Sequence, residues 1–93
     1  MSTINLTFPK TICRLAHNPY GRKIYKEQVE EHIDFSGQNT IVFPPEIIRA
    51  SSSFVQGFFT DIIEHIGYEH IREHISIESN NSSLINSIWD NLY

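Results

Sequence analysis

The chain has 93 residues, of which 40% are hydrophobic and 12% aromatic. This length and composition suit one domain with one modest core, and they exclude a two-domain protein and a compositionally disordered chain. The formal net charge of −4, from 7 basic and 11 acidic residues, argues against broad nucleic-acid binding, which needs a dominant positive surface.

The N-terminal segment, residues 1–11, predicts a strand and a connection. Ile4–Phe8 alternates apolar and polar residues, which is the period-two pattern of a strand, and Pro9 ends it. Residues 11–16 are ambiguous and one interpretation is a helical turn, whereas Asn18-Pro19-Tyr20-Gly21 predicts a turn. We treat residues 1–93 as a single domain with its core at residues 12–92.

The middle of the chain predicts a helix followed by a buried strand. Apolar residues recur at i, i+4 and i+8 within residues 22–33, which is typical of one helix face. Residues 36–39 predict a turn. Thr40–Phe43 is β-branched and aromatic, so we expect a buried strand, and the two prolines that follow require a bend or a bulge.

The strongest helix pattern follows three serines, Ser51, Ser52 and Ser53. Apolar residues between positions 54 and 66 form one wide face. Ser53 is expected to be the N-cap, with Gln56 completing a capping box. Gly57 lies inside this helix, where glycine costs about 1 kcal/mol relative to alanine. We therefore expect another element to approach the helix closely at Gly57.

The C-terminal part completes an alternation of strands and helices. Gly67 supplies the helix stop, and residues 68–73 form a connection. Ile75–Glu78 alternates as a strand, and residues 83–92 carry the apolar stripe of a last helix. The resulting β-α-β-α-β-α order, with about three helices, predicts an α/β domain with a mixed, mostly parallel sheet.

Three stretches together resemble a known family. Gly21-Arg22 opens the first long helix, Thr40–Phe43 leads through an Ile-rich bend to Ser52-Ser53-Phe54, and the helix ending at Gly67 precedes Ile75–Glu78 and a final helix. This pattern resembles the STAS domain, named for sulfate transporters and anti-sigma-factor antagonists, and looks closest to its STAS-like branch of unknown function. The resemblance covers about residues 12–92. A typical STAS domain has Asp-Ser-Ser-Gly where this chain has Ser-Ser-Ser-Phe.

The resemblance implies a protein-binding scaffold with a site at the serines. In antagonist STAS proteins, a partner kinase of the histidine-kinase-like ATPase fold phosphorylates the serine before the glycine, which breaks the complex. Carried onto this sequence, that serine is Ser53, with Ser52 adjacent. Ser51, Ser52 and Ser53 are therefore candidates for partner binding or phosphorylation, and the alternative is a capping serine with no further role.

Basic residues gather at one end of the chain. Five of them precede residue 27, whereas no Asp or Glu does. Arg14, Arg22 and Lys23 are candidates for a basic patch that binds a phosphate or an acidic partner. The alternatives are a solvated face, internal charge balance within the fold, and nucleic-acid binding through residues 10–26.

Two further patterns bear on catalysis. Residues 70–74 spell the H-x-x-E-H of inverted zinc proteases, and two histidines four positions apart on a helix can share a zinc ion. The segment lies between Gly67 and a strand, which leaves little room for a long helix, so we expect surface histidines and no metal site. Cys13 has His17 at i+4 but no evident companion Asp or Asn in this stretch, and we expect it to be a buried small residue.

The function we expect is non-enzymatic. One cysteine cannot form an intrachain disulfide, and the sequence shows neither a signal peptide nor a long apolar run, so we expect a cytoplasmic protein without membrane contact or cofactor. We expect a regulatory or scaffold domain that binds a protein, for which the resemblance suggests a histidine-kinase-like ATPase. The alternatives are a stand-alone inhibitor or defence-related protein that blocks its partner, and a small metal-binding hydrolase. The apolar helix stripes also suit a homodimer.

Overall fold

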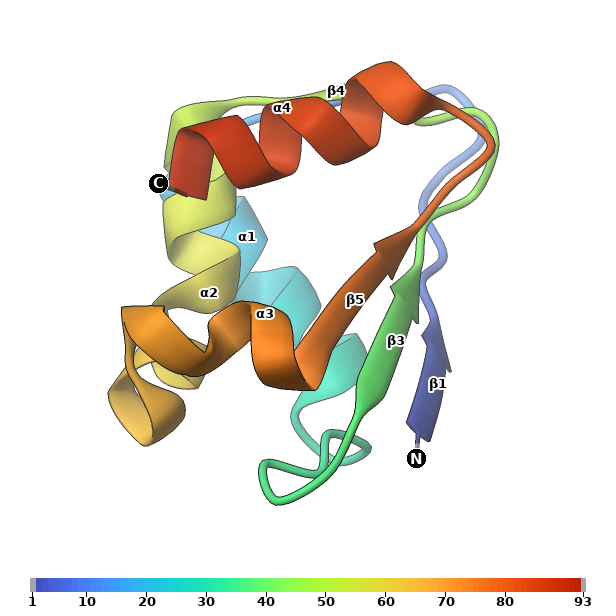
Figure 1. Cartoon of the computed structure of the whole chain (residues 1–93). Coiled ribbons are helices and arrows are strands. Elements are labelled where there is room, and N and C mark those ends of the chain that lie inside the picture. Colours follow the sequence, from blue (N-terminus) through green and yellow to red (C-terminus); the bar gives the residue numbers. More distant parts are fainter. Residues whose placement is uncertain (1, 93) are drawn as a thin grey trace.

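A three-stranded parallel sheet forms the centre of the molecule. The computed structural model describes residues 2–92 (Figure 1). Strands β1 (Ser2–Asn5), β3 (Asn39–Val42) and β5 (Ile75–Glu78) lie in the order β1-β3-β5, and both pairings are parallel. The predicted α/β class with a parallel sheet is confirmed. β5 has the expected bounds, whereas β1 ends three residues earlier than expected.

A second, two-stranded parallel sheet was not predicted. It pairs β2 (Arg14–Leu15) with β4 (Arg49–Ala50). The helical turn suggested for residues 11–16 is therefore wrong. Backbone bonds extend the pairing at both ends: the Ile48 N–H donates to the Cys13 carbonyl at 2.8 Å, and the Ser51 N–H donates to the Leu15 carbonyl at 2.8 Å.

The helices cover one face of the main sheet (Figure 1). They are α1 (Asn18–Ile24), which continues as the π-helical segment η1 (Tyr25–Val29), α2 (Ser52–Ile66), the 3₁₀ turn η2 (Tyr68–His70), α3 (Ile71–His74) and α4 (Ser82–Leu92). Alternate strand residues such as Thr3, Ser76 and Glu78 are exposed on the opposite face. The domain thus has two layers, and α3 adds a short helix where a connection was expected.

The start of α1 corrects another prediction. Residues 18–21 form its first turn instead of a separate turn, and Pro19 lies within that turn. The helix therefore begins four residues earlier than expected, and its π-helical continuation ends at Val29 instead of Ile33. Proline is tolerated at the beginning of a helix because the first N–H groups have no intrahelical acceptor.

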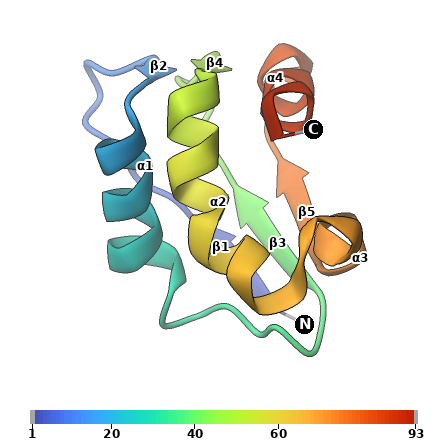
Figure 2. The ribbon, with the colours of Figure 1, turned by 90° about the vertical axis from the view of Figure 1, so that its left-hand side faces the viewer.

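Helices α1 and α2 pack side by side with their backbones in close contact (Figure 2). A Cβ atom on Gly57 would overlap the Asn18 carbonyl oxygen, and one on Gly21 would overlap the Phe54 carbonyl oxygen. The close approach expected at Gly57 is confirmed. Phe58, the next residue of α2, packs in the aromatic core. The centroid of its ring lies 5.2 Å from that of the Phe59 ring.

None of the helices in residues 2–92 has the length and apolar character needed to cross a membrane.

Candidate functional site

The three serines lie where β4 gives way to α2. Ser51 is the N-cap, because its Oγ accepts a hydrogen bond from the Phe54 N–H at 3.2 Å. Its extended backbone follows from the sheet bond that its own N–H makes to Leu15. The expected cap at Ser53 with a capping box to Gln56 is therefore wrong. Ser52 and Ser53 are the first helical residues, and both are exposed.

An open cavity of about 510 Å³ lies beside these serines. Its wall is formed by the β2–β4 pair, the beginning of α2 and the second half of α4, and the polar residues include Arg14, Arg49, Ser52, Ser87 and Asp90. Figure 2 shows these three elements at the same end of the molecule. Ser53 does not line the cavity. Of the two serines that the resemblance implicates, only Ser52 therefore faces this candidate site.

Of the three basic candidates, only Arg14 lines this cavity. Arg22 and Lys23 are exposed in the last turn of α1 and do not line it. The structure instead places Arg49 beside Arg14, because the two occupy the same register in β2 and β4. From the sequence, the loop Pro44–Arg49 was expected to border the binding surface at the start of the helix, but Arg49 was not included in the basic patch. No sequence pattern indicated that its segment pairs with that of Arg14.

Internal charge balance involves one residue of the basic N-terminal segment. Lys26 Nζ lies 3.6 Å from Glu30 Oε2 and 3.8 Å from Asp61 Oδ2. Within residues 2–92, Lys10, Arg14, Arg22 and Lys23 form no ion pair. Most of the basic segment is thus available to solvent or to a partner.

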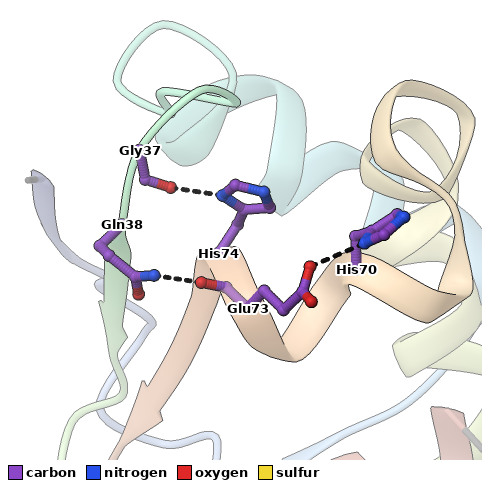
Figure 3. Close-up of polar contacts among 5 residues, drawn as sticks. All are labelled: Gly37, Gln38, His70, Glu73 and His74. Atoms are coloured by element: carbon purple, nitrogen blue, oxygen red, sulfur yellow. Dashed lines mark hydrogen bonds and ion pairs between the residues drawn. The ribbon is translucent and has the colours of Figure 1, made fainter.

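The H-x-x-E-H residues make separate structural contacts (Figure 3). His70 Nδ1 lies 2.7 Å from Glu73 Oε2, and His74 Nδ1 donates to the Gly37 carbonyl at 2.8 Å. The Gln38 side-chain amide donates to the Glu73 carbonyl. The contacts of Gly37 and Gln38 join α3 to the segment at the start of β3, whereas the His70–Glu73 contact is local. Within residues 2–92, no group of three or more His, Cys, Asp and Glu side chains is arranged to hold a metal ion.

Electrostatics distinguish several titratable side chains. The hydrogen bond and negative charge of Glu73 raise the pKa of the exposed His70 above its usual value. Hydrogen bonds from Ser36 lower the pKa of Asp34. Burial raises the pKa of Tyr25 to about 12, with smaller contributions from nearby carboxylates. None of these groups lines the cavity beside Ser52.

Cys13 is exposed, which corrects the expectation of a buried small residue. It immediately precedes Arg14 in β2, and its carbonyl takes part in the extended β2–β4 pairing. Among the described residues, its thiol forms no hydrogen bond with His17.

Comparison with known proteins finds a similarity to part of a longer curated protein. Neither a family model nor a solved structure matches the chain. Over 80 residues it is 34% identical to the BTB and MATH domain-containing protein 42 of Caenorhabditis elegans. The match covers 84% of this chain and 19% of that protein, so the chain spans about a fifth of the length of the curated relative it matches. The similarity therefore concerns a domain-sized segment of a longer protein.

Proposed function

We propose that this chain is a non-enzymatic regulatory or scaffold domain that binds a protein through the cavity beside Ser52. The observation that carries the proposal is the convergence of three separate elements, the β2–β4 pair, the start of α2 and α4, around one open cavity. Its lining combines apolar surface with polar side chains such as Arg14, Ser52 and Asp90. Protein-binding surfaces combine such polar rims with well-packed supporting elements. Leu15 and Ala50 line the cavity and are otherwise buried in the core, as is Phe54 in the first turn of α2, so the surface rests on packed elements.

The chemistry of the cavity favours binding over catalysis. Its described lining residues include no histidine, cysteine or lysine. Ser51 Oγ accepts a backbone hydrogen bond as a cap, and Ser87 Oγ donates to the Leu84 carbonyl. A serine nucleophile needs an adjacent base to activate it, and these two hydroxyls are hydrogen-bonded to backbone groups instead. Ser52 remains as an exposed hydroxyl at the rim.

The resemblance to STAS-like domains supports a specific partner, an ATPase of the histidine-kinase-like fold. A kinase of that class would act on Ser52 or Ser53, which are both exposed in the first turn of α2. A phosphate there would add a charge of about −1.5 to −2 near the positive end of the helix dipole. Modification of Ser52 would change the cavity directly, whereas Ser53 lies outside it.

The C. elegans relative supports the same general reading of a domain-sized module. The name of that protein describes BTB and MATH domains, and the matched segment is 19% of its length. A module of this kind would work by attaching to another chain, and a second copy of this chain is the simplest such partner. Sedimentation velocity on the purified protein distinguishes a monomer from a homodimer.

A pair of tryptophan variants tests the proposed binding face. A partner is first captured with the wild-type chain and is then produced in pure form. Its affinity is compared for three proteins: the wild-type chain and the two tryptophan variants. Ser52→Trp fills the cavity and is expected to weaken binding at least about tenfold. Glu64→Trp introduces the same side chain at an exposed position on α2, about 18 Å along the helix, and is expected to bind like wild type.

Equal binding by all three proteins would reject this face. Incubating the pure partner with ATP and the chain, followed by mass spectrometry of residues 51–53, tests the kinase relationship. Assaying the partner's own activity with and without the chain separates a regulator from an inhibitor that blocks it.

A further inference from the structure

Arg14 and Arg49 form a fixed pair of positive charges. They occupy the same register in the parallel strands β2 and β4, so their Cα atoms are adjacent across the pairing. The next residue of each strand, Leu15 or Ala50, is buried, which directs both arginine side chains to the exposed side. Neighbouring strands lie about 4.8 Å apart, so the two guanidinium groups can reach one ligand together.

Within residues 2–92, no carboxylate lies close enough to form an ion pair with either arginine. Neither arginine forms an ion pair or hydrogen bond among the described residues. Like charges placed opposite each other on neighbouring strands are destabilising. This chain has 11 acidic residues against 7 basic ones, yet none of the acids forms an ion pair with Arg14 or Arg49. Two adjacent, uncompensated arginines at a cavity therefore point to a negatively charged ligand from outside.

Asp90 is the acidic residue that shares this cavity. It is exposed on α4 and lines the same wall as Ser87. Its single negative charge opposes a bound anion, but the two arginines leave the cavity with a positive balance. The beginning of α2 bounds the cavity, while the arginines supply its charge.

We propose that Arg14 and Arg49 together bind an acidic peptide segment of the protein partner. This inference rests on the proposed protein-binding function and adds the chemistry of the ligand. Guanidinium groups bind carboxylates through paired hydrogen bonds, so two arginines can hold two successive acidic side chains. The volume of about 510 Å³ lies within the range of about 300–1,000 Å³ typical of sites that enclose small ligands.

The charge of the whole chain favours a short acidic peptide over a nucleic acid. A nucleic acid presents a continuous phosphate backbone, which the net charge of −4 repels beyond the arginine pair. A short acidic segment needs only the local positive charge. Salt screens such a contact, because exposed charges interact over about 10 Å at 0.1 M ionic strength.

A fluorescein-labelled hexaglutamate peptide serves as the probe, with fluorescence anisotropy at low salt as the readout. Wild type is expected to bind it saturably, and Arg14→Gln and Arg49→Gln to weaken binding about tenfold each. Arg22→Gln removes the same charge from exposed α1 and is expected to bind within twofold of wild type. Asp90→Asn is expected to strengthen binding two- to threefold. The Nε–Hε signals of Arg14 and Arg49 should shift together in an NMR titration.

Three results would overturn the proposal. They are no saturable binding by wild type, an equal loss in Arg22→Gln, or a six-residue oligothymidylate that binds more tightly than hexaglutamate through the same two arginines. Thermal melting checks the fold of each variant, and removing one of two like charges should not lower its stability.

Binding measurements with the captured partner distinguish failure of this proposal from failure of the proposed protein-binding function. If the partner loses affinity for Ser52→Trp but binds both arginine variants like wild type, the cavity is the binding face and the acidic ligand is wrong. If the partner binds Ser52→Trp and both arginine variants with wild-type affinity, the proposed binding face is wrong, whether or not hexaglutamate binds to the arginines.

Discussion

Replacing Gly57 with alanine tests how the two long helices pack. A Cβ atom at this position would overlap the Asn18 carbonyl oxygen and would lie 3.0 Å from the carbonyl carbon and 3.1 Å from the Cα of the same residue. All three are backbone atoms at the start of α1, so no side-chain rotation can make room. The two helices must therefore move apart. The packing of α1 against α2 is the most extensive contact between elements of this domain.

The expected cost follows from two opposing effects. Alanine is favoured over glycine inside a helix by about 1 kcal/mol. Forcing an extra methyl group into a packed interior costs about 1–3 kcal/mol, and the upper value applies here because the neighbours are backbone atoms. The difference predicts a net loss of about 2 kcal/mol in the free energy of unfolding, which for a domain of this size lowers the Tm by about 8–16 °C.

Urea unfolding followed by circular dichroism measures this loss. Gln56→Ala is the matched control, because it introduces alanine at the adjacent, exposed position of the same helix and should stay within about 0.5 kcal/mol of wild type. If Gly57→Ala equals or exceeds wild type in stability, helix propensity dominates and the close backbone contact between α1 and α2 is wrong.

Three further substitutions test contacts outside the helix pair. Asn39→Ala removes a buried side chain that makes three hydrogen bonds to backbone groups, so urea unfolding should show a loss of about 2–3 kcal/mol, and a loss below 0.5 kcal/mol would contradict their burial. Glu73→Gln should lower the pKa of His70 toward its usual value in an NMR titration. The pKa of His70 is higher in the folded than in the unfolded state, so its contact with Glu73 contributes stability at pH values below the unfolded-state pKa. That contribution is lost as the pH rises through the folded-state pKa. An unchanged pKa of His70 in Glu73→Gln would reject the contact. Ser51→Ala should cost about 0.5–2 kcal/mol in thermal or urea unfolding, whereas Ser53→Ala should cost less, and the reverse order would restore Ser53 as the cap.

Elements with a strong periodic pattern were predictable from sequence. The apolar face of α2 and the stop at Gly67 fixed that helix, and the structure shows Gly67 with φ +78°, a backbone conformation that favours glycine. β5 matches its predicted bounds, and α4 begins one residue earlier than expected. In each case local propensity and the tertiary fold favour the same structure, so one sequence pattern was sufficient.

The start of α1 was not predictable from its local pattern. Asn-Pro-Tyr-Gly suits a turn, and a proline in the first helical turn suits a helix equally well. The deciding information is tertiary: Gly21 lies against the backbone of Phe54 and Phe58, so this segment must present a glycine to α2. Only the packing of the two helices distinguishes the alternatives.

The candidate site was only partly predictable, because its geometry also depends on tertiary contacts. The serines were found because they precede a strong helix, although the cap lies two residues earlier than expected. The choice of cap depends on the sheet bond from Ser51 to Leu15, which holds Ser51 in extended geometry. The partner of Arg14 was missed because strands of two residues are too short to show a period-two pattern.

The short β2–β4 pair explains why residues distant in sequence form one surface. It places Arg14 beside Arg49 and, through the bond to Leu15, sets the residue at which α2 begins. The Asn91 side chain donates to the Ala50 carbonyl at 3.0 Å, so the same pair also anchors α4 against the cavity. A substitution that weakens this pairing should therefore disturb the arginines, the serines and Asp90 together. Separate disturbance of these groups would mean that each is positioned by its own helix or loop.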